Sequence, residues 1–124
     1  MANLETALKE ALTIDGAIGA ALVDYGSGMA LGALGDNTEL DLNIAAAGNT
    51  DVVRAKMRTM EMLNLHDNEI EDILISLSSQ YHLIRPLTTK SGRGLFLYLA
   101  LSRSRANLAM ARHQLRSIEA ALEL

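Results

Sequence analysis

Residues 15–34 read DGAIGAALVDYGSGMALGAL, and this stretch predicts a β-hairpin. Two apolar runs, 18–24 and 29–34, flank the turn sequence Tyr25-Gly26-Ser27-Gly28, and glycine-rich turns of this kind join antiparallel strands. In both runs, apolar residues occupy both sets of alternate positions. A strand without a polar face is covered by protein on both faces. We therefore expect helices on both faces of the sheet that contains this hairpin.

The sequence on either side of the hairpin predicts three helices and three further strands. Apolar residues recur at helical spacing before the hairpin, and Asp15-Gly16 ends that first helix. The remaining elements are expected at 41–65 (helix), 73–77, 81–87 and 95–101 (strands) and 108–122 (helix). Pro86 cannot donate a backbone hydrogen bond, so we expect it at a strand end or a bulge. The order α-β-β-α-β-β-β-α predicts an α/β (α+β) fold, a five-stranded antiparallel sheet with helices on both faces.

Length and composition exclude several classes of protein. With 124 residues, the chain is expected to form one domain spanning residues 1–124. It contains no cysteine, which excludes disulfides and thiolate metal sites. A net charge of −4 argues against a nucleic-acid partner. The most apolar run contains Asp24 and the hairpin turn, and the N-terminal residues lack the pattern of a signal peptide. We therefore expect a cytoplasmic protein that does not insert into a membrane.

The long helix at 41–65 carries three distinct surfaces on a helical wheel. Asp41 is a suitable N-cap for it. The core stripe consists of Leu42, Ala46, Val53, Met57 and Met60, with Ala45, Val52 and Leu63 beside it. A second stripe is small and mildly apolar, and comprises Ile44, Gly48, Ala55, Thr59 and Met62. Asp51, Arg54, Arg58 and Glu61 form a polar arc on the remaining side. The helical wheel places two polar residues, Asn49 and Lys56, close to the core stripe, and nothing in the sequence explains why polar side chains occur there.

A search for catalytic chemistry gives no active site, and no cofactor or metal is expected. Gly92-Arg93-Gly94 opens a strand rather than a helix, so it is not a phosphate-binding loop. The histidines are dispersed, and no nucleophile lies on a strand-to-helix elbow. An acidic cluster could instead serve a small enzyme as acid–base groups, but no base or second ligand accompanies it. The cluster consists of Asp67, Glu69, Glu71 and Asp72. We interpret it as protection of a strand edge against pairing with other chains, or as ion pairing of Asp72 with Arg85.

Three segments together resemble the roadblock/dynein light chain family of small α/β domains. They are the glycine-led hairpin at 15–31, the strand pair at 70–75 and 81–87, and the last strand with the last helix at 96–101 and 107–112. The resemblance extends from Leu4 to Leu122 and includes the order of the elements. It implies a dimer that joins two sheets edge to edge through the third strand, with the long helices side by side.

The resemblance also implies a function. Members of the family are adaptors or regulators of small Ras-like GTPases, or adaptors on dynein, and are generally not enzymes alone. The chain is longer than the minimal dynein type, so we favour a bacterial GTPase-linked module, as a homodimer or with a paralogue. A ligand-sensing domain of the profilin-like or PAS-like type is an alternative. Such a pocket needs polar groups among aromatic residues, and aromatic residues make up only 3% of the chain.

The resemblance and the helical wheel together name two expected surfaces. Small residues allow two helices to approach closely, and a two-fold interface uses the same patch on both copies. The expected dimer interface comprises Ile44, Gly48, Ala55, Thr59, Met62, Ile73, Ile75 and Leu77. The expected partner-binding surface comprises Asp51, Arg54, Arg58 and Glu61. If the GTPase binds elsewhere, the basic last helix around Arg105, Arg112 and Arg116 is the next candidate.

Overall fold

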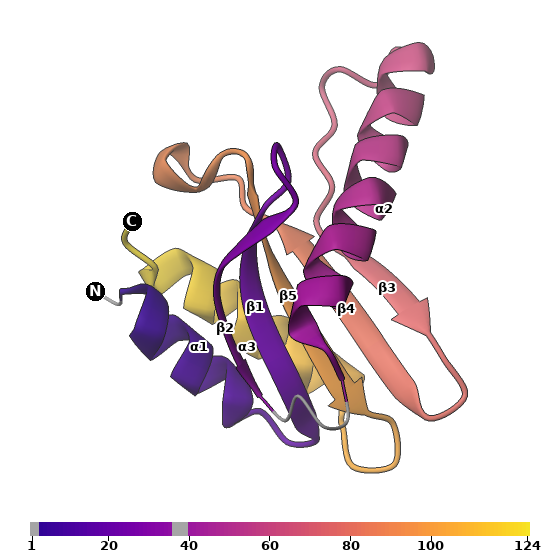
Figure 1. Ribbon diagram of the computed structural model, residues 1–124. Helices are drawn as coiled ribbons and strands as arrows, with labels where there is room; N and C mark the ends of the chain where they lie inside the picture. Colours follow the sequence, from indigo (N-terminus) through magenta and orange to yellow (C-terminus); the bar gives the residue numbers. More distant parts are fainter. Residues whose placement is uncertain (1–2, 36–39) are drawn as a thin grey trace.

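The computed structural model of the protein describes residues 3–35 and 40–124 (Figure 1). Its elements are α1 (Leu4–Leu12), β1 (Ala17–Asp24), β2 (Met29–Gly35), α2 (Leu42–Met62), β3 (Ile73–Ser76), β4 (Gln80–Pro86), the 3-10 helix η1 (Lys90–Gly92), β5 (Leu95–Ser102) and α3 (Leu108–Ala121). The predicted order of helices and strands is confirmed, and η1 is a short addition between β4 and β5. Pro86 is the last residue of β4, at a strand end as expected.

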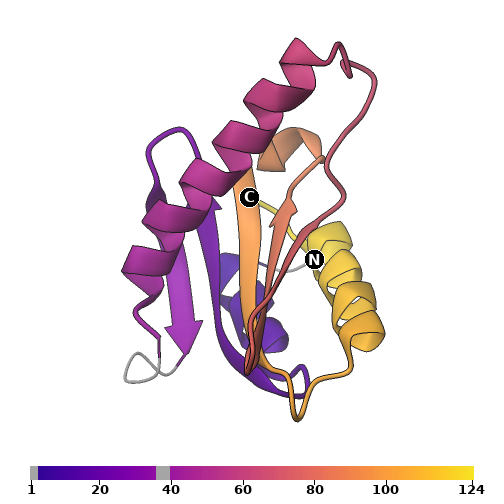
Figure 2. The same cartoon turned by 90° about the vertical axis from the view of Figure 1, so that its right-hand side faces the viewer.

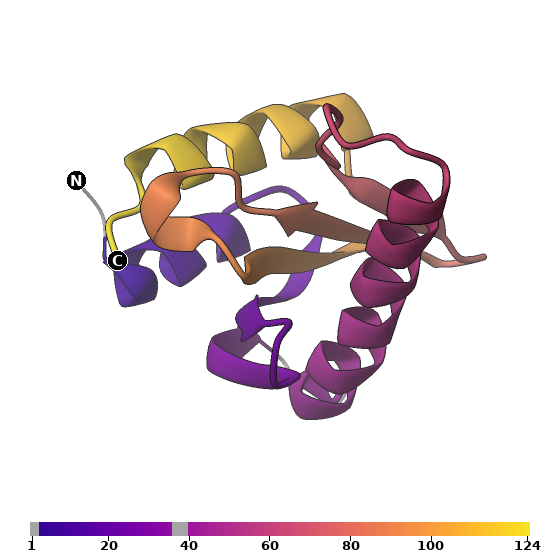
Figure 3. The ribbon, with the colours of Figure 1, turned by 90° about the horizontal axis from the view of Figure 1, so that it is seen from above.

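The strands form one antiparallel sheet in the order β2-β1-β5-β4-β3. Helices α1 and α3 cover one face, and α2 crosses the other (Figures 2 and 3). The central strands β1 and β5 are buried from their second to their seventh residues. Helices therefore lie on both faces of the sheet, as the apolar pattern predicts.

The face beneath α1 and α3 holds the larger core. Leu22, Leu97 and Leu99 project from the sheet, and Leu8 and Leu115 meet them from the two helices. All five side chains are buried. Asn3 caps α1 and Asn107 caps α3 through their side-chain oxygens, which accept from Thr6 N and Met110 N. This face is a closed helix–sheet core.

Helix α2 packs on the opposite face along the predicted core stripe. Its N-cap is Asp41, whose Oδ1 accepts from the backbone N–H groups of Asn43 and Ile44. Leu42, Ala46 and Val53 are buried against the sheet. The C-terminal half of α2 extends beyond the strands (Figure 1), and burial decreases along it. The helix ends at Met62 rather than at the expected residue 65.

Two expectations about packing are wrong. Met57 and Met60 are only half-buried, and Leu63 is 59% exposed, because this end of α2 projects past the sheet. Strand β2 is not covered on both faces like β1, because it is the edge strand and its alternate residues are exposed.

No helix among residues 3–35 and 40–124 is long and apolar enough to cross a membrane.

The expected ion pair of Asp72 with Arg85 is also wrong. Arg85 Nε donates to the carboxylate of Glu119 at 2.6 Å, and Asp72 accepts two hydrogen bonds from Arg112 at 3.0 and 3.1 Å. Both partners belong to α3. The expectation considers only the pairing of β3 with β4. In the structure, α3 covers the same face of the sheet, and its Glu119 and Arg112 supply the partners of Arg85 and Asp72.

Candidate functional site

The small-residue stripe of α2, defined by Ile44, Gly48, Ala55, Thr59 and Met62, is uncovered over most of its length. Ile44 and Met62 are each 71% exposed, and a Cβ built on Gly48 would meet no atom within 4 Å. The Thr59 hydroxyl donates to the carbonyl of Ala55 at 3.0 Å, so its polar group is satisfied within the helix. The stripe is thus an apolar surface of low relief on the outside of the molecule.

Strand β3 lies beside this stripe and forms the second edge of the sheet. Ile73 and Ile75 pair with Ile84 and His82 of β4 and are half-buried on the face that α2 crosses. On its other side, β3 has no strand partner among the described residues. Leu77, expected as part of this strand, instead lies beyond its end in the turn, where it is 42% exposed and its N–H donates to Gln80 O.

An open groove of about 350 Å³ lies between α2 and the sheet. Its walls are the first turns of α2, including Ile44, Ala45 and Gly48, and its other lining residues include Asn49, His82 and Tyr98. Asn49 is buried, and its side chain lies within hydrogen-bonding reach of the Tyr98 hydroxyl, which compensates the burial of its amide. This contact explains a residue for which the helical wheel gives no reason, since Tyr98 is far away in sequence. The stripe, the edge of β3 and this groove together form the uncovered part of the α2 face.

The polar arc of Asp51, Arg54, Arg58 and Glu61 is exposed, as the wheel predicts. None of the ion pairs formed within residues 3–35 and 40–124 includes any of the four. The alternative arrangement, a helix face held by its own ion pairs, is therefore not what the structure shows. Two guanidinium groups and two carboxylates are presented to solvent along one side of α2.

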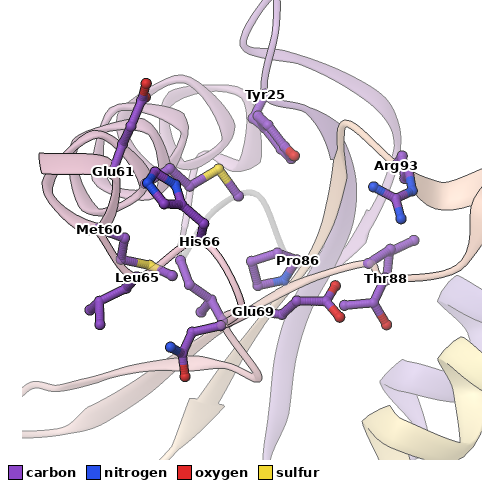
Figure 4. Close-up of a pocket in the computed structure, with 13 residues that line it drawn as sticks. Tyr25, Met60, Glu61, Leu65, His66, Glu69, Pro86, Thr88 and Arg93 are labelled. Carbon is purple, nitrogen blue, oxygen red and sulfur yellow. The ribbon is translucent and has the colours of Figure 1, made fainter. Parts of the chain in front are cut away.

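A pocket of about 390 Å³ lies at the C-terminal end of α2 (Figure 4). Tyr25 and Arg93 reach into it from one side and His66 from the other, with Pro86 between them. Glu61 of the polar arc borders it, and Met57, Met60, Leu65, Ile70 and Leu87 supply apolar surface. No local pattern in the sequence indicates this pocket, because the hairpin turn, α2, the loop after it and the end of β4 each contribute only a few residues.

The acidic cluster does not assemble into a catalytic site. Asp67, Glu69 and Glu71 are exposed, and Asp72 is held by Arg112. Within the described parts of the chain, no three His, Asp or Glu side chains lie together as metal ligands. The arrangement fits the interpretation of acidic residues that precede and flank an edge strand.

The basic surface of the last helix is smaller than its sequence implies. Arg112 is committed to Asp72, whereas Arg105 and Arg116 are exposed. Arg103, just before the helix, stacks on the ring of Tyr81 at 4.8 Å and donates to Leu77 O. Two of the three arginines named as the second candidate surface are therefore available to a partner.

The fold is similar to that of several solved structures, although no protein-family model and no curated protein matches the sequence. A Roadblock/LC7 domain from Streptomyces avermitilis is 12% identical, with a TM-score of 0.76 over 97% of this chain and 94% of that one. MglB of Myxococcus xanthus is 16% identical, with a TM-score of 0.73 over 92% of this chain and 83% of that one. MglB in a tetrameric arrangement is 17% identical, with a TM-score of 0.73 over 93% of this chain and 81% of that one.

At these identities, the likeness concerns the path of the backbone. The order of the helices, the order of the strands and nearly the full length of the chain agree with these domains. This chain therefore has the Roadblock/LC7 fold that its sequence resemblance implies.

Proposed function

We propose that this protein is a non-catalytic, dimeric adaptor or regulator of a small Ras-like GTPase, acting by protein–protein contact. The observation that carries the proposal is the uncovered part of the α2 face. There, an apolar helix stripe, an open groove and an unpaired strand edge adjoin one another. The family resemblance supplies the class of partner, and the Roadblock/LC7 and MglB structures support the fold on which that resemblance rests.

A second copy of the chain is the occupant that this surface fits best. Two small-residue stripes can approach closely across a two-fold axis, because Gly48 has open space beside it. The two β3 edges would then pair and satisfy their free backbone groups, which are otherwise an aggregation hazard. A stable interface of this kind buries about 1,600 Å² in total. A paralogue with the same fold could replace the second copy.

The polar arc is the proposed contact for the GTPase. In the dimer, the small-residue stripe is occupied, and the core stripe already lies on the sheet. Asp51, Arg54, Arg58 and Glu61 remain exposed on the outer side of each helix. Arginine is enriched at the centres of protein interfaces, and Arg54 and Arg58 have no carboxylate partner within the described residues. We also propose that the protein acts in the cytoplasm, as part of a bacterial module.

The dimer is tested by sedimentation equilibrium of three variants. Gly48→Trp places a bulky side chain in the helix seam, and Ile73→Asp places a charge at the strand edge. We expect both to yield monomers or aggregates, whereas His113→Trp, at an exposed position on α3 across the sheet, leaves the dimer intact. A stable monomer of the unmodified chain at tens of micromolar would contradict the dimer.

The partner class is tested by affinity capture from an extract of the native cells, with captured proteins identified by mass spectrometry. Recovery of a small GTPase that depends on Arg54 and Arg58 supports the proposal. Recovery of a dynein subunit would support the alternative role of an adaptor light chain. The purified protein should show no heat on titration with GTP and Mg²⁺; binding with turnover would contradict a non-catalytic role.

A further inference from the structure

The floor of the groove beside α2 contains a hydrogen-bonded histidine. Both ring nitrogens of His82 are engaged: Nε2 lies 2.8 Å from Gln80 Oε1, and Nδ1 lies 3.2 Å from the Tyr98 hydroxyl. Because an amide oxygen only accepts, Nε2 carries the proton and Nδ1 accepts from Tyr98. The two rings meet edge to face, with centroids 5.4 Å apart. The neutral imidazole satisfies both contacts, with one nitrogen donating and the other accepting.

The surroundings of His82 favour the neutral ring. Burial raises the pKa of Tyr98 to about 12, so its hydroxyl keeps the proton that it donates. Burial also lowers the pKa of His82 below its usual value of 6.5. Asn49 of α2 hydrogen-bonds the same tyrosine, and Ile75 of β3 and Ala100 of β5 are the cross-strand neighbours of His82.

Few charged groups face this site. Asp41, at the start of α2, is the charged residue among those described in the lining of the groove. Its carboxylate is occupied in capping the helix, where Oδ1 accepts from two backbone N–H groups. The residues of β3, β4 and β5 that neighbour His82 directly are uncharged. A protonated His82 would thus have only Asp41 nearby to offset its charge.

We propose that proton binding to His82 separates the two copies of the dimer, an inference that rests on the proposed function. In the monomer, the groove is open and water reaches the ring. In the dimer, the stripe of the second copy covers the groove. A proton on Nδ1 then removes the acceptor of the Tyr98 hydroxyl and places a charge beneath an apolar cover, where charge is costly.

Linkage gives the sign of the effect. The dimer lowers the pKa of His82 further than the monomer does, so two separate chains bind more protons than the dimer. The contribution of His82 to dimer stability is fully present above its pKa in the monomer. It is lost progressively as the pH falls from that value, which lies below 6.5, through the lower pKa of the ring in the dimer. Below both values, each unit of difference in pKa weakens the dimer by about tenfold for each histidine.

The test is the dissociation constant of the dimer, measured by sedimentation equilibrium at pH 7.5 and pH 5.5. For the unmodified chain, we expect it to rise severalfold at the lower pH, because each ring takes up a proton more readily in the separated chains. For His82→Gln, which retains a neutral polar side chain, we expect less than a twofold change. His113→Gln is the matched control on an exposed histidine. Asp41→Asn, which preserves an N-cap side chain, tests whether the aspartate titrates instead. Both controls should respond to pH like the unmodified chain.

A dimer that forms at pH 7.5 and is equally stable at pH 5.5 would overturn this inference and leave the proposed function standing. A pH response that persists in His82→Gln would overturn it as well. Absence of a dimer at either pH would contradict the proposed function and this inference together. If His82→Gln does not fold, the ring pKa of His82 can be measured by NMR in the unmodified chain at concentrations above and below the dissociation constant of the dimer. Equal values would refute the proposal, and a lower value in the dimer would support it.

Discussion

The two faces of the sheet are built from the same strands but differ in how completely helices cover them. On the α1/α3 face, two helices bury a continuous leucine core, and α3 adds ion pairs to Arg85 and Asp72. On the α2 face, one helix crosses the sheet and leaves β3, part of β4 and its own small-residue stripe uncovered. The first face completes the monomer, whereas the second has the apolar surface and the open strand edge of an unfinished core. This difference is the reason that the proposed dimer contact is assigned to the α2 face.

The largest expected effect concerns the buried carboxylate of Glu119. It accepts from Arg85 Nε at 2.6 Å and from Thr88 N at 2.9 Å, and its side chain is 6% exposed. Glu119→Ala leaves the Arg85 guanidinium without a carboxylate partner and with only the long bond from Nη1 to the Glu71 carbonyl at 3.4 Å. We therefore expect a loss of about 3–5 kcal/mol in the free energy of unfolding. Chemical denaturation measures this loss. Glu61→Ala, at an exposed position on α2, should change stability by less than about 0.5 kcal/mol; equal effects would contradict the contrast between the faces.

Core truncation should show the same contrast between side chains of similar size. Leu99 is completely buried beneath α1 and α3, and Ile44 is 71% exposed on α2. We expect Leu99→Ala to cost about 2–5 kcal/mol. Ile44→Ala should be nearly neutral in the monomeric Gly48→Trp background, yet weaken the dimer of the otherwise unmodified chain. Denaturation and sedimentation distinguish the two effects, and a large loss of monomer stability in Ile44→Ala would show that this stripe belongs to the core.

A smaller effect is expected at the ion pair between β3 and α3. Arg112 holds Asp72 through two hydrogen bonds, but its side chain is 38% exposed, so solvent screens the pair. We expect Asp72→Asn to reduce the free energy of unfolding by about 1 kcal/mol. Asp67→Asn, at an exposed position in the preceding loop, serves as control and should have no measurable effect.

The smallest effect on stability, with a large effect on binding, is expected at the polar arc. Arg54→Glu combined with Arg58→Glu should leave the melting temperature and the dimer nearly unchanged, because both side chains are exposed. Affinity for the captured GTPase should fall at least about tenfold, or 1.4 kcal/mol. Arg105→Glu, in the turn before α3, combined with Arg116→Glu on α3 is the matched control. Loss of binding in that control alone would move the partner surface to the last helix.

Local patterns in the sequence predict most of this fold. The hairpin follows from its turn and its apolar runs, and the N-cap and core stripe of α2 follow from the helical period. What could not be predicted depends on contacts between distant segments. Glu119 lies 34 residues from Arg85 in the sequence, although the two side chains form an ion pair. Asn49 is far in sequence from Tyr98, the side chain that its amide contacts. The exposure of β2 depends on its place at the edge of the sheet, which only the strand order reveals.

The small-residue stripe and the polar arc could be located on α2 from its helical period, whereas the groove and the pocket could not be found in this way. The wheel separates the small-residue stripe and the polar arc because both lie within one helix. The groove needs His82 and Tyr98 from two strands, and the pocket needs Tyr25 and Arg93 on one side and His66 on the other. Sites assembled from single residues of many segments leave no periodic signal in a sequence.

Hydrogen–deuterium exchange at low and high protein concentration tests the account most directly, because the sheet has two edges and only one is assigned to the dimer. If the α2 face is the association surface, the amides of β3 become protected as the concentration rises from about 1 to 100 μM, as their free N–H groups enter an intermolecular ladder. The amides of β2, at the opposite edge, should exchange at the same rate throughout. Unchanged exchange in β3, or protection confined to β2, would contradict the central claim.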